Sequence, residues 1–273
     1  MPVDVSLLDD YVALKDPERR RQVERRGGFF IVEGLQAVKA LVCSRYPVRS
    51  ILVAERKAEA VADMLRSVAH ADGGRDGRVD VPVIVRPDDE VAAATGFAFH
   101  RGVLGSGQRL PLPSLGELLP SARAIAVLEG LNDHENLGAL FRNAAAFGID
   151  AVVLDPTTAD PLYRRSVRVS IGHVLRVPWT RVEGWPAGLD ELRRAGFFVA
   201  ALTPSPDARS IDELVDDPPE RVAFVVGAEG PGLSEDALGA ADARIRIPLA
   251  PGVDSLNVAT AAAIAFHRLF SRR

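Results

Sequence analysis

FVVGAEGPGLSEDAL (residues 224–238) begins as an apolar strand, continues into a turn with three glycines and ends as the start of a helix. Gly227, Gly230 and Gly232 permit positive φ and let the backbone approach a ligand closely. Ser234 is suited to cap the helix, which carries acidic residues in its first turn. The glycine spacing is not the dinucleotide fingerprint G-x-G-x-x-G, and no G-K-[ST] phosphate loop is present. The turn is therefore a candidate ligand site that lacks both phosphate-binding signatures.

Apolar strands recur on both sides of this turn, from Ala122 onward. Helical stretches or loops separate them, and most of the strands are apolar along nearly their whole length. This pattern is typical of a parallel sheet covered on both faces, so we predict an α/β fold for the C-terminal half. The expected strands are AIAVLEG (124–130), AVVLD (151–155), VLRVPW (174–179), FFVAAL (197–202), RVAFVVG (221–227) and RIRIPL (244–249).

The N-terminal half predicts a second, smaller α/β unit. Strands at 29–34, 50–53 and 81–85 alternate with helices, and a surface helix is expected over residues 6–26. The proline-rich stretch SGQRLPLPSLGELLPSA (106–122) is the best linker candidate. We therefore predict an N-terminal domain over 1–108, a linker over 109–120 and a C-terminal domain over 121–273.

Composition and charge limit the function classes. The chain has 33 Lys plus Arg against 37 Asp plus Glu, a net charge of -4, so any surface for a polyanion must be local. One cysteine, Cys43, excludes an internal disulfide, and the five histidines show no metal-site spacing, so no metal is expected. Without a secretory signal or an apolar run of membrane-spanning length, we expect a soluble cytoplasmic protein. The densest basic stretch, a candidate nucleic-acid contact or else a solvated helix face, comprises Arg19, Arg20, Arg21, Arg25 and Arg26.

Two further polar segments follow strands of the C-terminal half. In LEGLNDHENLGALFRNAAAFGID, Asn136 is placed to cap a helix that also carries Arg142. In IRIPLAPGVDSLNVATAAAIAFHRLF, Ser255 and Asn257 precede an alanine-rich helix. Taken singly, these residues are helix caps or a solvated arginine. Glu229 in the glycine turn is a candidate site residue, because a carboxylate buried there would need a partner.

The three segments recur in one order, and in this the chain resembles the SpoU/TrmH branch of the SPOUT methyltransferases. The family's motifs are Asn-x-Gly with a following Arg, Gly-x-Glu-Gly-x-Gly, and Ile-Pro with a following Ser-Leu-Asn-Val. The matching residues are Asn136, Gly138 and Arg142 for the first motif, Gly227, Glu229, Gly230 and Gly232 for the second, and Ile247, Pro248, Ser255, Leu256, Asn257 and Val258 for the third.

The resemblance extends with less specificity over the rest of the chain. SVRVSIGHVLRVP (166–178) is similar to the family's central segment, with Ser170 and Gly172 aligned. FFIVEG (29–34) and HRGVLG (100–105) look like the start and end of the L30e-like RNA-binding domain of many relatives. The loop before Asn136 departs from the family, because it reads Asp-His-Glu where a proline or basic residue is more usual.

The resemblance implies a deep trefoil knot in the C-terminal domain, with S-adenosyl-L-methionine (AdoMet) bound in a bent form. Because AdoMet has no phosphate, it needs no phosphate cradle. The resemblance also implies a homodimer formed through the C-terminal domain. The cofactor-binding residues that it implies are Leu202, Thr203, Gly227, Ala228, Glu229, Gly230, Gly232, Ile247, Leu249, Leu256, Asn257 and Val258.

The implied activity is methyl transfer to a ribose 2′-hydroxyl of RNA. Arg142 is either the base that removes the hydroxyl proton or a cation that orients phosphate and stabilises the developing alkoxide. Asn136 is expected to orient Arg142 or the ribose, and Glu229 to position the site. Ser255 and Asn257 are expected to hold a loop, the cofactor or the partner subunit.

Several alternatives stay open on sequence alone. Ribosomal RNA is favoured over transfer RNA, in a housekeeping or an antibiotic-resistance role. A base methyltransferase of the same superfamily and a non-catalytic RNA-binding protein with a degenerate methyltransferase fold are the main competitors. A nicotinamide dehydrogenase is a distant third, because the glycine spacing does not suit it.

Overall fold

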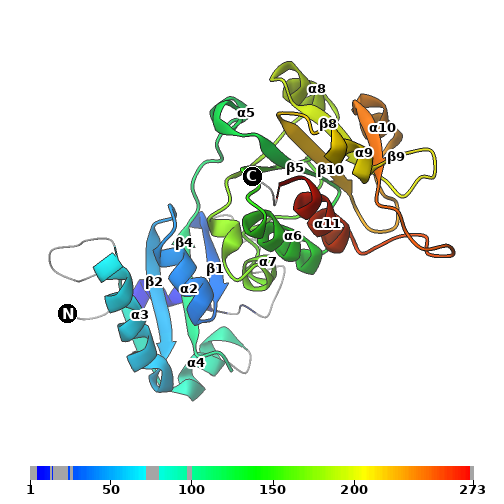
Figure 1. Ribbon diagram of the computed structural model, residues 1–273. Helices are drawn as coiled ribbons and strands as arrows, with labels where there is room; N and C mark the ends of the chain where they lie inside the picture. Colours follow the sequence, from blue (N-terminus) through cyan, green and yellow to red (C-terminus); the bar gives the residue numbers. More distant parts are fainter. Residues whose placement is uncertain are drawn as a thin grey trace. The chain divides into compact units, whose positions relative to one another are not determined.

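The structure is a computed structural model that describes residues 5–12, 14, 24, 27–71, 80–96 and 100–270. The chain divides into two compact units, each built on a sheet of its own (Figure 1). The first unit comprises Met1–Pro111 and Leu162–Arg176, and the second comprises Leu112–Pro161 and Val177–Arg273. The sequence-based division placed Leu162–Arg176 in the C-terminal domain, whereas in the structure this segment belongs to the first unit.

The first unit contains a four-stranded mixed sheet in the order β1-β4-β2-β3. Strand β4 runs antiparallel to β1 and to β2, whereas β3 runs parallel to β2. Leu162–Arg176 contributes α7 and η4, and α7 packs against β1. The elements are η1 (Val5–Tyr11), β1 (Phe29–Glu33), α2 (Leu35–Val42), β2 (Val48–Ala54), η2 (Glu55–Lys57), α3 (Ala58–Ala71), β3 (Val83–Arg86), α4 (Asp88–Thr95), β4 (Val103–Gln108), α7 (Arg164–Val169) and η4 (His173–Leu175).

The described part of the N-terminal stretch belongs to the core of the first unit. Tyr11 and Leu14 are buried with apolar residues of the sheet, and the Tyr11 hydroxyl donates to the Ser50 carbonyl at 2.8 Å. Burial raises the pKa of the Tyr11 phenol above its ordinary value. The prediction of a surface helix over residues 6–26 is therefore wrong for this part, where a short 3-10 helix carries core side chains.

The second unit contains a seven-stranded sheet in the order β7-β6-β5-β10-β8-β11-β9. Every neighbouring pair is parallel, which confirms the predicted parallel α/β sheet. The elements are α5 (Leu115–Leu118), η3 (Leu119–Ser121), β5 (Ala124–Glu129), α6 (His134–Ala146), β6 (Ala151–Leu154), β7 (Trp179–Arg181), α8 (Ala187–Arg194), β8 (Phe198–Leu202), β9 (Arg209–Ser210), α9 (Ile211–Asp216), β10 (Val222–Gly227), α10 (Glu235–Ala240), β11 (Ala243–Arg246) and α11 (Val258–Phe270).

The central strands of this sheet are buried on both faces, which explains their continuous apolar sequences. On one face, side chains such as Val127 and Val225 pack with residues of α5, α8 and α10. On the other, Phe224 contacts Phe266 of α11, with ring centroids 6.4 Å apart. Helices α6 and α11 pack against each other in this layer (Figure 1). Both begin near the carboxyl ends of strands and so lead to the site.

One expected strand begins later than the sequence suggested. VLRVPW was predicted as a strand, but η4 occupies its first residues and β7 begins only at Trp179. Pro178 has no backbone N–H to donate to a strand ladder, so the strand starts after it. Within the described ranges, no helix combines the length and the apolar character that a membrane span needs.

Candidate functional site

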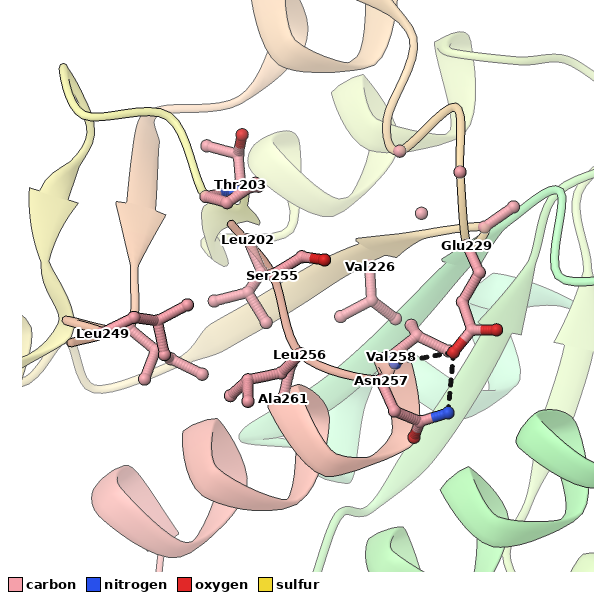
Figure 2. Close-up of a pocket in the computed structure, with 16 residues that line it drawn as sticks. Leu202, Thr203, Val226, Glu229, Leu249, Ser255, Leu256, Asn257, Val258 and Ala261 are labelled. Atoms are coloured by element: carbon pink, nitrogen blue, oxygen red, sulfur yellow. Dashed lines mark hydrogen bonds between the residues drawn. The ribbon is translucent and has the colours of Figure 1, made fainter. Parts of the chain in front are cut away.

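A cavity of about 460 Å³ lies where β8, β10 and β11 end and α11 begins (Figure 2). This is the edge at which open parallel sheets bind ligands. Every residue that the family resemblance implied for the cofactor lines the cavity, as does Ser255. The lining residues are Leu202, Thr203, Pro204, Val226, Gly227, Ala228, Glu229, Gly230, Gly232, Ile247, Leu249, Ser255, Leu256, Asn257, Val258 and Ala261.

Two lining residues, Val226 and Ala261, were missed from the sequence. Pro204 belongs to the segment 202–204, which the family resemblance implies for the cofactor. Val226 is the residue before Gly227 on β10, and Ala261 lies on the first turn of α11, so both fall beside matched motifs. A signal was present for Ala261, because it belongs to the alanine-rich helix that follows the third motif.

The glycine turn folds back on the end of β10. A Cβ atom at Gly227 would lie 2.3 Å from the carbonyl carbon of Gly232, so no larger residue fits there without a backbone shift. The Gly232 N–H donates to the Ala228 carbonyl at 3.0 Å and closes the turn. Gly230 and Gly232 adopt φ of +92° and +71°, which favour glycine. Backbone therefore forms this side of the cavity.

Asn257 joins the three motifs through its side chain. Its Nδ2 donates to Oδ1 of Asn136, 121 residues away in sequence, and to Oε1 of Glu229, each at 2.7 Å (Figure 2 shows the second bond). Glu229 Oε1 also accepts from the Val258 N–H at 3.4 Å. The structure thus brings Asn136, Glu229 and Asn257 together, and we call these three residues the Asn257 hub.

Asn257 is also the N-cap of α11. Its Oδ1 accepts from the Thr260 N–H at 3.1 Å, so the amide satisfies a helix donor with its oxygen and binds the other motifs with its nitrogen. Ser255, the other candidate cap, is exposed on the cavity wall. Glu229 is exposed as well, so it is not the buried carboxylate that the sequence raised as a possibility.

Asn136 does not cap α6, contrary to the sequence prediction. Oδ1 of Asp133 accepts from the backbone N–H groups of Glu135 and Asn136, both at 2.8 Å, and Asp133 is the N-cap. The prediction is wrong because the helix starts three residues earlier than expected. Asn136 therefore lies in the first helical turn, where its side chain accepts from Asn257 instead.

Arg142 lies on α6 but outside the hub. Its side chain is exposed, does not line the cavity and makes no hydrogen bond or ion pair with the residues that the structure describes. The adjacent Asn143 donates to the Ala259 carbonyl of α11 at 2.9 Å. The helix is therefore fixed, whereas the guanidinium that it carries is open to solvent.

Glu129 was not predicted as a site residue, although it ends β5 beside the glycine turn. It is buried and accepts hydrogen bonds from Trp185 Nε1 at 2.5 Å and from the Ser234 N–H and hydroxyl at 2.9 and 2.6 Å. Ser234 also caps α10, as the sequence predicted. Glu129 thus attaches the end of the glycine turn to the sheet. The only sequence signal was an acid at the end of an apolar strand.

Asp155 holds the loop that leads from β5 to α6. Its Oδ1 accepts from the N–H groups of Gly130 at 3.1 Å and Thr158 at 2.7 Å. Burial alone would raise the pKa of Asp155, but hydrogen bonds from Thr157, Thr158 and Gly130 outweigh it and hold that pKa below its ordinary value. The ionised carboxylate therefore supports the segment that carries Asp133 and Asn136.

Two further expectations concern other parts of the chain. The arginine run at 19–26 lies outside the described residues. Among the residues that are described, no group of three or more His, Cys, Asp or Glu side chains is arranged to hold a metal ion.

Comparison with known proteins identifies the family. A family model described as the SpoU rRNA Methylase family matches residues 123–267, more than half of the chain. An uncharacterised tRNA/rRNA methyltransferase of Mycobacterium tuberculosis is 42% identical over 261 residues, which cover 95% of this chain and 87% of that protein.

Solved structures share the fold over nearly the whole chain. The SpoU methyltransferase AviRb from Streptomyces viridochromogenes, in complex with the cofactor AdoMet, matches with a TM-score of 0.77 at 20% identity and covers 99% of both chains. An AdoMet-bound rRNA methyltransferase from Sinorhizobium meliloti matches with a TM-score of 0.74 at 24% identity and covers 98% of this chain and 95% of the other. From the family match and the sequence relative, together with three motifs that meet at one cavity, we conclude that the chain belongs to the SpoU rRNA methylase family of RNA methyltransferases.

Proposed function

We propose that this chain transfers the methyl group of AdoMet to a ribose 2′-hydroxyl of RNA, with ribosomal RNA as the substrate. The observation that carries the proposal is the Asn257 hub, in which the three motifs meet beside one cavity. The description of the family, which names rRNA methylation, favours ribosomal over transfer RNA.

The cavity has the chemistry that AdoMet requires. Leu202, Ile247 and Leu249 supply apolar surface for an adenine ring, and the glycine turn supplies backbone groups close to the ligand. The carboxylate of Glu229 lines the same cavity and favours a sulfonium cation. When bound, AdoMet supplies an electrophilic methyl group.

The Asn257 hub would place the reacting helix. Its two amide hydrogen bonds join the first turn of α6 to the glycine turn, and Asn143 joins α6 to α11 further along. Because small displacements of reacting groups lower the rate steeply, this fixed position matters for Arg142.

Arg142 would act as a cation rather than as a base, so the proton of the ribose hydroxyl would pass to water and the cofactor would leave as S-adenosyl-L-homocysteine. An arginine guanidinium keeps its proton at neutral pH, so it is a poor proton acceptor. With an exposed side chain that makes no ion pair with a described residue, it is available to an RNA phosphate and to the charge that develops on the ribose oxygen. This version of the mechanism makes Arg142 essential for the reaction and dispensable for cofactor binding.

We extend the proposal to the trefoil knot. The strand order β10-β8-β11-β9 supports the knot. After β8 the chain forms β9 at the edge of the sheet, and it then returns to form β10 on the opposite side of β8. It finally crosses back over β8 to form β11 between β8 and β9. Crossings of this kind are rare in sheets of unknotted chains. Mechanical unfolding from both ends tests the knot, since a knotted chain stops short of its full contour length.

We also extend the proposal to the first unit and to the assembly. The mixed sheet of the first unit would be an L30e-like RNA-binding domain, and two chains would pair through their second units. Analytical ultracentrifugation tests the dimer, and a monomer at micromolar concentration would contradict it.

One experiment tests the reaction and its alternatives. The purified chain is incubated with AdoMet and with bulk bacterial ribosomal RNA or bulk transfer RNA, and nuclease digests are analysed by mass spectrometry. We expect a ribose-methylated nucleoside from ribosomal RNA. Methylation of a base would contradict ribose chemistry, and product from transfer RNA alone would contradict the substrate. Absence of AdoMet binding in calorimetry would favour a non-catalytic RNA-binding protein.

A further inference from the structure

Three arginines in the first unit surround one carboxylate. Glu33, the last residue of β1, is buried. Arg101 Nε lies 3.7 Å from one of its oxygens, and Arg164 Nε and Arg168 Nη1 lie 3.8 and 3.9 Å from the other. A buried carboxylate needs a compensating cation, but one suffices for its charge. The cluster therefore holds more positive charge than Glu33 requires, and we call Glu33, Arg101, Arg164 and Arg168 the Glu33 cluster.

Two members of the Glu33 cluster keep their hydrogen-bond donors. The Glu33 distances of Arg101 and Arg168 exceed hydrogen-bond length, and neither side chain bonds to any other residue in the described parts of the chain. A guanidinium carries five N–H donors. The side chains of Arg101 and Arg168 are 53% and 35% exposed, so a ligand from solvent can reach both.

Other arginines of the chain use their donors in the fold. Arg49 binds both oxygens of Asp10, at 2.8 and 3.1 Å. Arg221 donates to three backbone carbonyls and stacks on Phe197, 4.1 Å from the ring centroid. Arg101 and Arg168 differ, because they lie near Glu33 and donate no hydrogen bond to any residue that the structure describes.

From this geometry we propose that Arg101 and Arg168 bind backbone phosphates of the RNA substrate, with Glu33 as the residue that positions them. The guanidinium fork matches the oxygens of a phosphate, and a shared carboxylate limits how far each side chain can turn. The net charge of -4 gives the chain no general attraction to polyanions, so binding needs such a local cluster. The identity of the partner rests on the proposed function, which requires RNA.

RNA binding by single-residue variants tests this proposal without catalysis. Fluorescence anisotropy with labelled fragments of bulk bacterial ribosomal RNA, in the absence of AdoMet, gives the affinity over a range of salt concentrations. We expect Arg101→Ala and Arg168→Ala each to weaken binding about tenfold and to reduce the slope of log affinity against log salt by about 0.7 to 0.9. Arg168→Lys, which keeps the charge but not the fork, should lie between wild type and Arg168→Ala.

A matched control removes the same charge elsewhere in the first unit. Arg66 is exposed on α3 and pairs with Asp63, so Arg66→Ala should leave affinity and salt slope unchanged. Wild-type affinity and slope in both alanine variants of the Glu33 cluster would overturn the proposal. If Arg168→Ala does not fold, the more exposed Arg101→Ala decides alone.

The result can be separated from the proposed reaction. If the wild-type chain methylates a base instead of a ribose, the proposed function fails while the salt slopes still decide on the Glu33 cluster. If the wild-type chain binds no RNA, both proposals are overturned. If it methylates a ribose and the alanine variants bind RNA normally, only the Glu33 cluster is rejected.

Discussion

Asn257 and Arg142 belong to two of the family motifs, the third and the first, but the protein holds their side chains differently. The Asn257 amide bonds to Asn136, to Glu229 and to the backbone of α11, so its position is fixed from several directions. The Arg142 guanidinium bonds to none of the residues that the structure describes. Internal hydrogen bonds thus fix the cavity wall, whereas none of the described residues is a partner for the catalytic candidate.

This difference separates binding of the cofactor from reaction with the substrate. A wall fixed by internal hydrogen bonds needs little rearrangement when a ligand enters, which favours affinity. A cation without an internal partner has its donors available for the charge of another molecule. If the two functions are separate, a substitution in one region should leave the function of the other region intact.

Arg142→Ala should have the largest effect. We expect methylation of RNA to fall by about a hundredfold to a thousandfold, because one donor aimed at the transition state contributes on this scale. The AdoMet affinity measured by calorimetry should change less than about twofold, since Arg142 does not line the cavity. Arg194→Ala, which removes an exposed charge on α8, is the control for net charge. Joint loss of cofactor binding and activity in Arg142→Ala would contradict a purely catalytic role.

Gly227→Ala should damage the cofactor wall. Its new Cβ would meet the Gly232 backbone at 2.3 Å, so the turn has to move. We expect AdoMet affinity to fall about a hundredfold and the melting temperature to drop, as for other substitutions that overpack a site. Gly239→Ala on α10 is the matched control, because its Cβ would point into open space. Equal AdoMet affinity in the two variants would show that the turn does not form the cofactor site.

Asn257→Ala and Asn257→Asp separate the two halves of the Asn257 amide. Alanine removes the hub and the helix cap, so we expect about a tenfold loss of AdoMet affinity and about 1 kcal/mol of stability. Aspartate keeps an oxygen for the Thr260 N–H but places a second carboxylate beside Glu229. The Asn257→Asp variant should therefore keep the helix cap and its stability but lose affinity for AdoMet. Calorimetry measures the AdoMet affinity and urea unfolding measures the stability. Equal losses of stability in the two variants would contradict separate roles for the amide oxygen and the amide nitrogen.

Much of this wall was predictable from the sequence, because each part follows a strand in a recognisable motif. Parallel strands bring their carboxyl ends to one edge, and the motif residues after β10 and β11 meet there. The cap of α6 was not predictable with the same certainty. Asp133 and Asn136 are both good caps, and only the geometry of the preceding loop selects the aspartate.

The missed features depend on contacts between segments far apart in sequence. Glu129 bonds to Trp185 and Ser234, which lie 56 and 105 residues away, and no local pattern announces such partners. The sequence of Leu162–Arg176 continues the pattern of helices and strands that is typical of the second unit. Its residues Arg164 and Arg168 nevertheless pair with Glu33, and the segment belongs to the first unit. Periodicity gives the type of an element but not the unit that it joins.

Glu129→Gln should affect stability more than chemistry. The carboxylate accepts three hydrogen bonds, and a glutamine amide would turn an N–H₂ group toward at least one of the donors. We expect a loss of about 1 to 3 kcal/mol in the free energy of unfolding. We also expect a few-fold loss of AdoMet affinity, because Glu129 holds Ser234 at the end of the glycine turn. Urea unfolding and calorimetry provide the measurements. Glu235→Gln, exposed on the neighbouring helix, controls for the charge, and stability equal to that of this control would exclude an anchoring role.

Asp155 should produce the smallest effect, and the pH dependence that it contributes should appear only in acid. Its pKa in the folded state lies below the ordinary value of 3.8, so the unfolded chain binds the proton first as the pH falls. The stabilisation is therefore fully present above pH 3.8 and is lost as the pH drops through the folded-state pKa. In Asp155→Asn this part of the pH dependence should disappear, and the variant should be less stable than wild type at neutral pH. Thermal unfolding of both proteins from pH 6 to pH 3 measures the difference, and parallel curves would mean that the Gly130 loop does not depend on the ionised carboxylate.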